Sequence, residues 1–135
     1  TAVFNFGGTI NEICKIKSVG TLGASSLVID SSNIAQSVGT LEVWCNNGRN
    51  PSTNYVSSNN GYLVSGNNQI PYTLAVGSIS NELDLSAAQK INATEAGSGK
   101  TGTGKIYELK IKPTTTGLDL AGDYSDTITV TVGYK

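Results

Sequence analysis

The stretch GDYSDTITVTVGYK, residues 122–135, carries the clearest structural signal in this sequence. Apolar and polar residues alternate along it, and many of its side chains are β-branched. Alternation with a period of two places successive side chains on opposite faces of a strand, and β-branched residues favour that conformation. One face holds Tyr124, Ile128, Val130, Val132 and Tyr134, and the other holds Ser125, Thr127, Thr129, Thr131 and Gly133. We therefore predict a half-buried strand here.

Similar strand signals recur along the chain between clusters of glycine, asparagine and serine. The expected strands contain Ala2, Phe4, Phe6, Gly8 and Ile10; Ile13, Cys14 and Ile16; Leu27 and Ile29; Leu41, Val43 and Cys45; Tyr62 and Val64; Ile70, Tyr72, Leu74 and Val76; and Tyr107, Leu109 and Ile111. Asn60 and Gly61 suit a type I′ hairpin turn because both residues tolerate positive φ. Only residues 83–91 could form a helical turn. The pattern predicts an all-β protein, an antiparallel β-sandwich.

Size and charge exclude several classes of protein. The 135 residues suffice for one domain with its own core. Nine Lys and Arg residues against ten Asp and Glu residues give a net charge of -1, so we expect no nucleic-acid partner. The sequence holds no apolar run long enough for a transmembrane helix, and we expect no membrane span. If the protein is exported, we expect Thr1 to follow a cleavage site.

The two cysteines, Cys14 and Cys45, each end or interrupt an apolar alternating run. They could form a disulfide across two strands or remain a pair of buried thiols, and we predict the disulfide. A zinc site is disfavoured because the chain has no histidine and no CxxC motif. A disulfide would place the protein outside the cytoplasm.

The segment AGSGKTGTGK, residues 96–105, resembles phosphate-binding chemistry and satisfies GxGxxG from Gly97 to Gly102. A dinucleotide loop must follow a buried strand and open a helix, whereas this segment precedes an expected strand. A P-loop would require glycine at position 94, which is threonine. We therefore expect a flexible hairpin loop.

Catalysis is not indicated by the sequence. Without histidine, Ser-His-Asp and Cys-His arrangements are impossible. The carboxylate pairs Glu82/Asp84 and Asp123/Asp126 fall at expected turns, where acidic residues are ordinarily solvated. We expect neither an enzyme nor a protein with a cofactor or a bound metal.

Asparagine, serine and glycine crowd the sequence between Cys45 and Ile70. Asparagine side chains mimic backbone turns, so we expect loops and hairpin tips in this region. A carbohydrate-binding surface that uses these asparagines with Tyr55 and Tyr62 is an alternative.

Four segments in order resemble one known family, the subunits of archaic (Csu-type) chaperone–usher pili, which carry the spore coat protein U domain. These segments are TAVFNFGGTINEICKI (1–16), GTLEVWCNN (39–47), NNQIPYTLAV (67–76) and GDYSDTITVTVGYK (122–135). The last is the most specific, since it is similar to the family's G-x-Y-x-D motif and closing strand. Residues 77–104 carry no part of the resemblance.

The resemblance implies an incomplete immunoglobulin-like sandwich that lacks its last strand and is completed by a donor strand. Residues 1–10 would be the donor-strand extension and residues 11–135 the pilin domain. The donor residues would be Ala2, Phe4, Phe6, Gly8 and Ile10, and the acceptor-groove wall would be Tyr124, Ile128, Val130, Val132 and Tyr134. A periplasmic chaperone would fill the groove first, and the extension of another copy would then replace it.

The function that the resemblance implies is that of a structural subunit, the major pilin, of an extracellular chaperone–usher pilus used in attachment and biofilm formation. The other partners would be the outer-membrane usher and further copies of the chain. Two alternatives remain: a carbohydrate-binding sandwich, and a spore-coat-type surface protein with the same domain. The alternative for the N-terminal residues is an ordinary first strand of the chain's own sandwich.

Overall fold

The computed structural model describes residues 1–20, 27–30, 32–92 and 94–133, and these residues form strands with no helix among them. The strands are β1 (Cys14–Gly20), β2 (Gln36–Cys45), β3 (Ser52–Ser57), β4 (Tyr62–Ser65), β5 (Asn68–Val76), β6 (Ser80–Asp84), β7 (Gln89–Ile91), β8 (Lys105–Pro113) and β9 (Ile128–Gly133). The predicted all-β class is confirmed.

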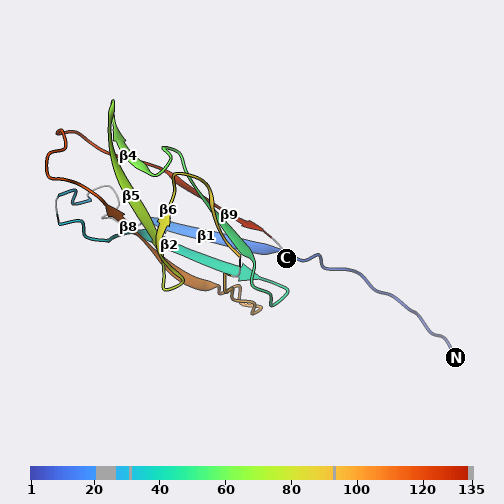
Figure 1. Ribbon diagram of the computed structural model, residues 1–135. Coiled ribbons are helices and arrows are strands. Elements are labelled where there is room, and N and C mark those ends of the chain that lie inside the picture. The colour runs from blue at the N-terminus through green and yellow to red at the C-terminus, as the bar shows by residue number, and fades with distance from the viewer. Residues whose placement is uncertain (21–26, 31, 93, 134–135) are drawn as a thin grey trace.

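The strands form two antiparallel sheets that pack face to face (Figure 1). The larger sheet has the order β1-β2-β8-β5-β4, and β6 pairs with β5. The smaller sheet has the order β7-β3-β9. Consecutive strands therefore often belong to different sheets, as in an immunoglobulin-like sandwich.

The core lies between the sheets, and the alternation of the sequence determines which side chains enter it. On β2, β5 and β8 every second residue is buried, as predicted: Leu41, Val43 and Cys45; Ile70, Tyr72, Leu74 and Val76; Tyr107, Leu109 and Ile111. The smaller sheet contributes the fully buried Tyr55, whose hydroxyl accepts a hydrogen bond from Thr53 at 2.9 Å. Burial of such large apolar side chains stabilises the fold by about 1.5–3 kcal/mol each.

Two local predictions were wrong, and one local possibility is not realised. Residues 27–29 form no strand. Instead, the side chain of Gln36 accepts a hydrogen bond from the amide of Val28 and donates one to its carbonyl, both at 2.7 Å. Residues 83–91 form no helical turn, because their two ends belong to strands β6 and β7. The asparagine-rich region is not loop throughout, since it contains β3.

The turn at Asn60 and Gly61 has the predicted backbone but not the predicted partners. Both residues have positive φ, and the amide of Tyr62 donates to the carbonyl of Asn59 at 3.2 Å. However, β3 and β4 do not pair with each other, since β4 pairs with β5 in the other sheet. The turn therefore sends the chain from one sheet to the other.

The glycine-rich segment 97–104 is a connection between the sheets, so the hairpin prediction was wrong. It joins β7 of the smaller sheet to β8 of the larger sheet and lies against β2. Gly97 exchanges backbone hydrogen bonds with Val43 and Cys45 at 2.9 and 2.8 Å, and the indole nitrogen of Trp44 donates to the carbonyl of Gly99 at 2.8 Å. The segment does precede a strand, as predicted.

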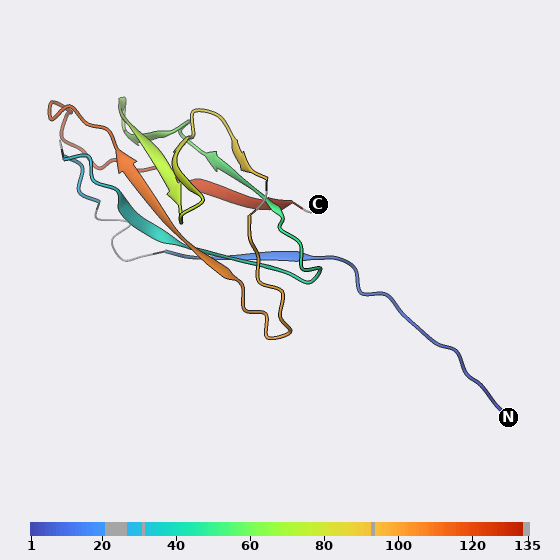
Figure 2. The same cartoon turned by 60° about the horizontal axis from the view of Figure 1, so that its bottom comes forward.

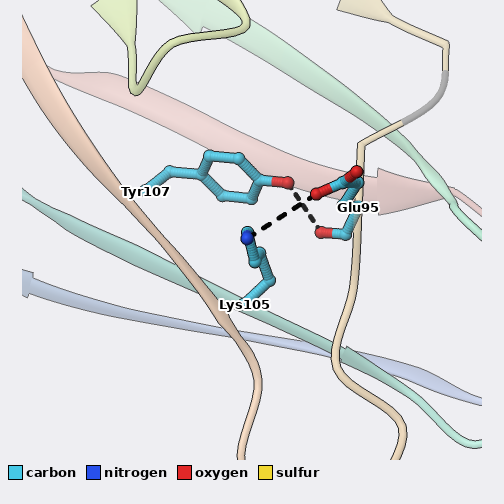
Figure 3. A network of polar contacts seen from close by, with 3 residues as sticks. All are labelled: Glu95, Lys105 and Tyr107. Atoms are coloured by element: carbon cyan, nitrogen blue, oxygen red, sulfur yellow. Dashed lines mark hydrogen bonds and ion pairs between the residues drawn. The ribbon is translucent and has the colours of Figure 1, made fainter.

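The residues just before this segment are fixed to β8 (Figure 3). The hydroxyl of Tyr107 donates to the carbonyl oxygen of Glu95 at 2.8 Å, and the Lys105 ammonium lies 3.7 Å from the Glu95 carboxylate. Burial and the nearby Glu95 charge raise the pKa of Tyr107. Because both charged side chains are largely exposed, the tyrosine hydrogen bond contributes more to this attachment than the ion pair.

Candidate functional site

A groove of about 870 Å³ opens into the core between the two sheets. Its floor consists of buried core residues: Leu41, Leu63, Tyr72, Leu109 and Ile111. One side is formed by residues that lie on or next to β1 and β2: Ile16, Val19, Leu27, Ile29 and Val38. The opposite side is formed by Tyr124, Ile128 and Val130. The groove is therefore lined mainly by large apolar side chains.

The two strands that flank the groove, β1 and β9, are both edge strands (Figure 2). In the described part of the chain, the ladder of β1 is with β2 alone, and the ladder of β9 is with β3 alone. Each strand therefore presents one edge of backbone amides and carbonyls without a ladder partner there. Such an edge is a template for an added strand.

The structure brings together three of the predicted wall residues. Tyr124, Ile128 and Val130 are half-buried and pack against the core from the rim of the groove. Val132 lies farther along β9, opposite Thr53, and outside the groove lining. Tyr134 lies outside the described residues. The strand begins at Ile128 rather than at Tyr124, although Ser125 forms an isolated bridge with Val64.

The wall on the β1 side was not predicted from the sequence. Ile16, Leu27, Ile29 and Val38 are half-buried and pack against the core there. Leu27 and Ile29 alternate in the sequence and both line the groove, but the alternation indicated a strand and not a groove wall.

Asp126 is the centre of a polar cluster at one end of the groove, so the expectation of a solvated turn residue was wrong. Its carboxylate accepts hydrogen bonds from the hydroxyls of Ser57 and Tyr72. It also accepts the backbone amides of Asn59 at 3.1 Å and Thr127 at 2.7 Å. The cluster therefore joins the start of β9 to β5 and to the turn after β3. Asp123, in contrast, is exposed.

Tyr72 lies in the floor of the groove, whereas Tyr55 is buried in the core and does not line it. Burial, together with the hydrogen bond to Asp126, raises the pKa of Tyr72 well above its ordinary value. Burial also raises the pKa of Tyr55. Tyr55 is fully buried, so its ring is not available to a sugar, which removes one residue from the carbohydrate-binding alternative.

The predicted donor residues lie on an exposed N-terminal segment. Residues 1–13 belong to no strand, and Figures 1 and 2 show residues 1–10 extending away from the sandwich. The exposed fractions are 84% for Phe4, 96% for Phe6 and 90% for Ile10. Ala2 and Gly8 are also exposed, and a Cβ atom at Gly8 would meet nothing within 4 Å. The segment is thus not a first strand of its own sandwich.

The predicted disulfide between Cys14 and Cys45 is confirmed, with an S–S distance of 2.03 Å. The two residues form the last directly opposed pair of the β1–β2 ladder. The bond therefore fixes the first residue of β1 to the last residue of β2, beside the point where the N-terminal segment leaves.

Comparisons with known proteins agree with the resemblance of the sequence. The family model of the Spore Coat Protein U domain matches residues 1–131. A search of curated proteins found no match. Among the described residues, no helix has the length and apolar character needed to cross a membrane. The matched family is structural rather than enzymatic and is associated with proteins of the chaperone–usher pilus type. The chain therefore belongs to the Spore Coat Protein U domain family.

Proposed function

We propose that this chain is the major structural subunit of a chaperone–usher pilus and that it polymerises by donor-strand exchange. Residues 1–10 of one copy enter the groove of the next, and residues 11–135 form the sandwich that receives them. A periplasmic chaperone occupies the groove before assembly, and an outer-membrane usher exports the fibre to the cell surface, where it supports attachment and biofilm formation.

The single observation that supports this proposal most is the apolar groove between two edge strands. An extended strand placed there can pair with backbone groups of β9 or β1 while its alternate side chains enter the core, which is the β-augmentation mode of binding. Thr129 and Thr131 of β9 face outward and are exposed, so added side chains would enter beside Ile128 and Val130.

The N-terminal segment has a matching pattern. Alternate residues of a strand are about 7 Å apart, so Phe4, Phe6, Gly8 and Ile10 would span about 20 Å, close to the length of six-residue β9. Burial of the three large side chains would contribute roughly 5–9 kcal/mol before the backbone hydrogen bonds are counted. A linkage of this size would dissociate slowly.

The geometry of exchange leads to a fibre. The donating segment and the receiving groove are different surfaces of one molecule, so the contact is heterologous and can be repeated without closing. The described residues contain no disulfide beyond Cys14–Cys45, so the inserted strand itself would join successive subunits.

The experiment that tests the proposal compares two charge substitutions on neighbouring donor residues. Phe6→Asp places a carboxylate in an apolar groove and should abolish polymerisation. Asn5→Asp adds the same charge to the opposite face of the segment and should leave polymerisation near the wild-type level. Fibres are counted by electron microscopy, and polymers that survive cold detergent are resolved by gel electrophoresis.

Deletion of residues 1–10 provides the second arm of this experiment. The deleted chain should remain monomeric and should still accept the segment of a wild-type copy, so that it terminates growing fibres. Fibres of normal number and length from Phe6→Asp would rule out the donor assignment. A surface layer without fibres would favour the spore-coat-type alternative.

A further inference from the structure

Asn46 holds the short link between the N-terminal segment and β1. Its side-chain nitrogen donates to the carbonyl of Asn11 at 2.9 Å, and its side-chain oxygen accepts from the amide of Ile13 at 2.9 Å. Its own backbone amide donates to the carbonyl of Ile13 at 3.0 Å. One asparagine thus makes three hydrogen bonds to a three-residue link.

These contacts extend the β1–β2 ladder beyond its last pair. Cys14 and Cys45 end the ladder, and the next residue of the β2 side, Asn46, uses its amide side chain in place of a further strand. Residues 11–13 are consequently kept in line with β1. Residues 1–10 then leave the end of the sandwich and point away from it (Figures 1 and 2).

The chain's own groove lies in the opposite direction. Its lining includes Ile16, Ser18, Val19 and Gly20 of β1, which follow the disulfide rather than precede it. A reversal of the chain at residues 11–13 would be a hairpin loop of ordinary length. It would lay residues 1–10 antiparallel to β1, alongside the chain's own open groove.

Such self-insertion would compete strongly with insertion into another copy. A short flexible tether gives an effective concentration in the millimolar range, whereas free copies meet at their actual, lower concentration. A segment that must serve a neighbour therefore needs a feature that prevents reversal.

We infer that Asn46 is a positioning residue that disfavours insertion of residues 1–10 into the chain's own groove and directs them to a second copy. The inference rests on the proposed donor-strand function. It assigns to Asn46 the choice between a closed monomer and an open, polymerising chain.

The test uses the full-length chain, refolded without other proteins over a range of concentrations. Wild type is compared with Asn46→Ala, Asn46→Asp and Asn50→Ala. Asn50 is exposed on the same loop and serves as the matched control. The fraction of polymer is measured by light scattering. The chain has two phenylalanines, Phe4 and Phe6, both in the donor segment, so fluorophenylalanine labelling and ¹⁹F NMR report directly on that segment.

Asn46→Ala should raise the concentration at which half of the chain is polymeric by about tenfold, because it removes two hydrogen bonds from the link. In its monomers the chemical shifts of the two ¹⁹F signals should no longer change when H₂O is replaced by D₂O. The absence of such a change indicates buried rings. Asn46→Asp can still accept from Ile13 but cannot donate to Asn11, so it should give an intermediate result. Asn50→Ala should match wild type.

Wild-type polymerisation by Asn46→Ala, or exposed ¹⁹F signals in its monomers, would overturn the inference. If that variant does not fold, as judged by Trp44 fluorescence, Asn46→Asp decides by the same two measurements. In another outcome, the wild type forms no polymer and its rings are exposed, while the rings of the Asn46 variants are buried. This outcome would support the role of Asn46 and refute the proposed function. If the wild type forms no polymer and the rings are exposed in the monomers of every variant, both the role of Asn46 and the proposed function are refuted.

Discussion

Asp126 shows how one side chain can organise the end of a groove. Four donors converge on its carboxylate, two of them hydroxyls of other strands or turns and two of them backbone amides. Ser57 in turn accepts the amide of Gly61 at 2.8 Å, so the cluster also fixes the turn that carries the chain between the sheets. Removing the carboxylate would leave several partly buried donors without a partner.

We predict that Asp126→Ala lowers the free energy of unfolding by about 2–4 kcal/mol, because the partly buried hydroxyls and amides that donate to the carboxylate lose their acceptor. Asp123→Ala, which changes an exposed carboxylate three residues earlier, should change it by less than about 0.5 kcal/mol. Urea unfolding followed by Trp44 fluorescence measures both. Equal effects of the two substitutions would contradict the central role of Asp126.

At the scale of residues, the sequence predicted which side chains enter the core but not the role of Asp126. The alternating residues of β2, β5 and β8 were assigned to the correct face because alternation is a local property. Asp126 meets Ser57 and Tyr72 across separations of 69 and 54 residues. No local pattern reports such contacts, so its position near a turn suggested a solvated residue.

At the scale of elements, the glycine-rich connection 97–104 depends on a close backbone approach. A Cβ atom on Gly104 would lie 2.6 Å from Cγ of Glu42 and 2.7 Å from the carbonyl oxygen of Val43. The amide of Gly104 also donates to the Glu42 carboxylate at 2.9 Å. Glycine is therefore required there by packing against β2.

We predict that Gly104→Ala destabilises the fold by about 1–3 kcal/mol, since the connection must move away from β2. Gly99→Ala is the matched control, because the nearest atom to its Cβ would be 3.8 Å away, and its effect should be within about 0.5 kcal/mol. Thermal unfolding of both variants provides the comparison. A harmless Gly104→Ala would show that the connection is not held against β2 in solution.

Strands inside the sandwich were predicted where apolar residues alternate, and prediction failed where pairing is decided by distant residues. The strands around 41–45, 62–64, 70–76 and 107–111 were found, whereas β3, β6 and β7 were missed because none has a clear alternating apolar face. The turn at Asn60 and Gly61 was recognised from its residues. Its strand partners were not, because the next strand pairs in the other sheet.

At the scale of the whole molecule, the groove and the N-terminal segment have complementary features on separate surfaces. Periodicity alone left residues 2–10 as either a donor strand or an ordinary first strand. The groove could not be predicted from local patterns at all, since it depends on how two sheets are aligned. Its expectation came from the resemblance to a family, and the structure places an apolar groove of about 870 Å³ beside β9.

We predict that a peptide of residues 1–10 binds a chain of residues 11–135 and raises its melting temperature by roughly 5–15 °C at saturating concentration. Val130→Asp in the chain should abolish this shift because it places a charge on the groove wall. Thr131→Asp, on the exposed face of the same strand, should preserve it. Each shift is measured relative to the variant's own melting temperature. Equal shifts in the two variants would argue against binding in the groove.

The position of the Cys14–Cys45 bond has a mechanical consequence. Tension applied through the N-terminal segment first meets the hydrogen bonds that Asn46 makes to Asn11 and Ile13. Beyond them, the covalent bond at Cys14 passes the load directly into β2. An edge strand pulled from its end would otherwise separate from its neighbour one hydrogen-bonded pair at a time. β2 is held by β1 on one side and β8 on the other, so the load is distributed across the larger sheet. Reduction of this bond would make β1 the first part of a stretched molecule to yield.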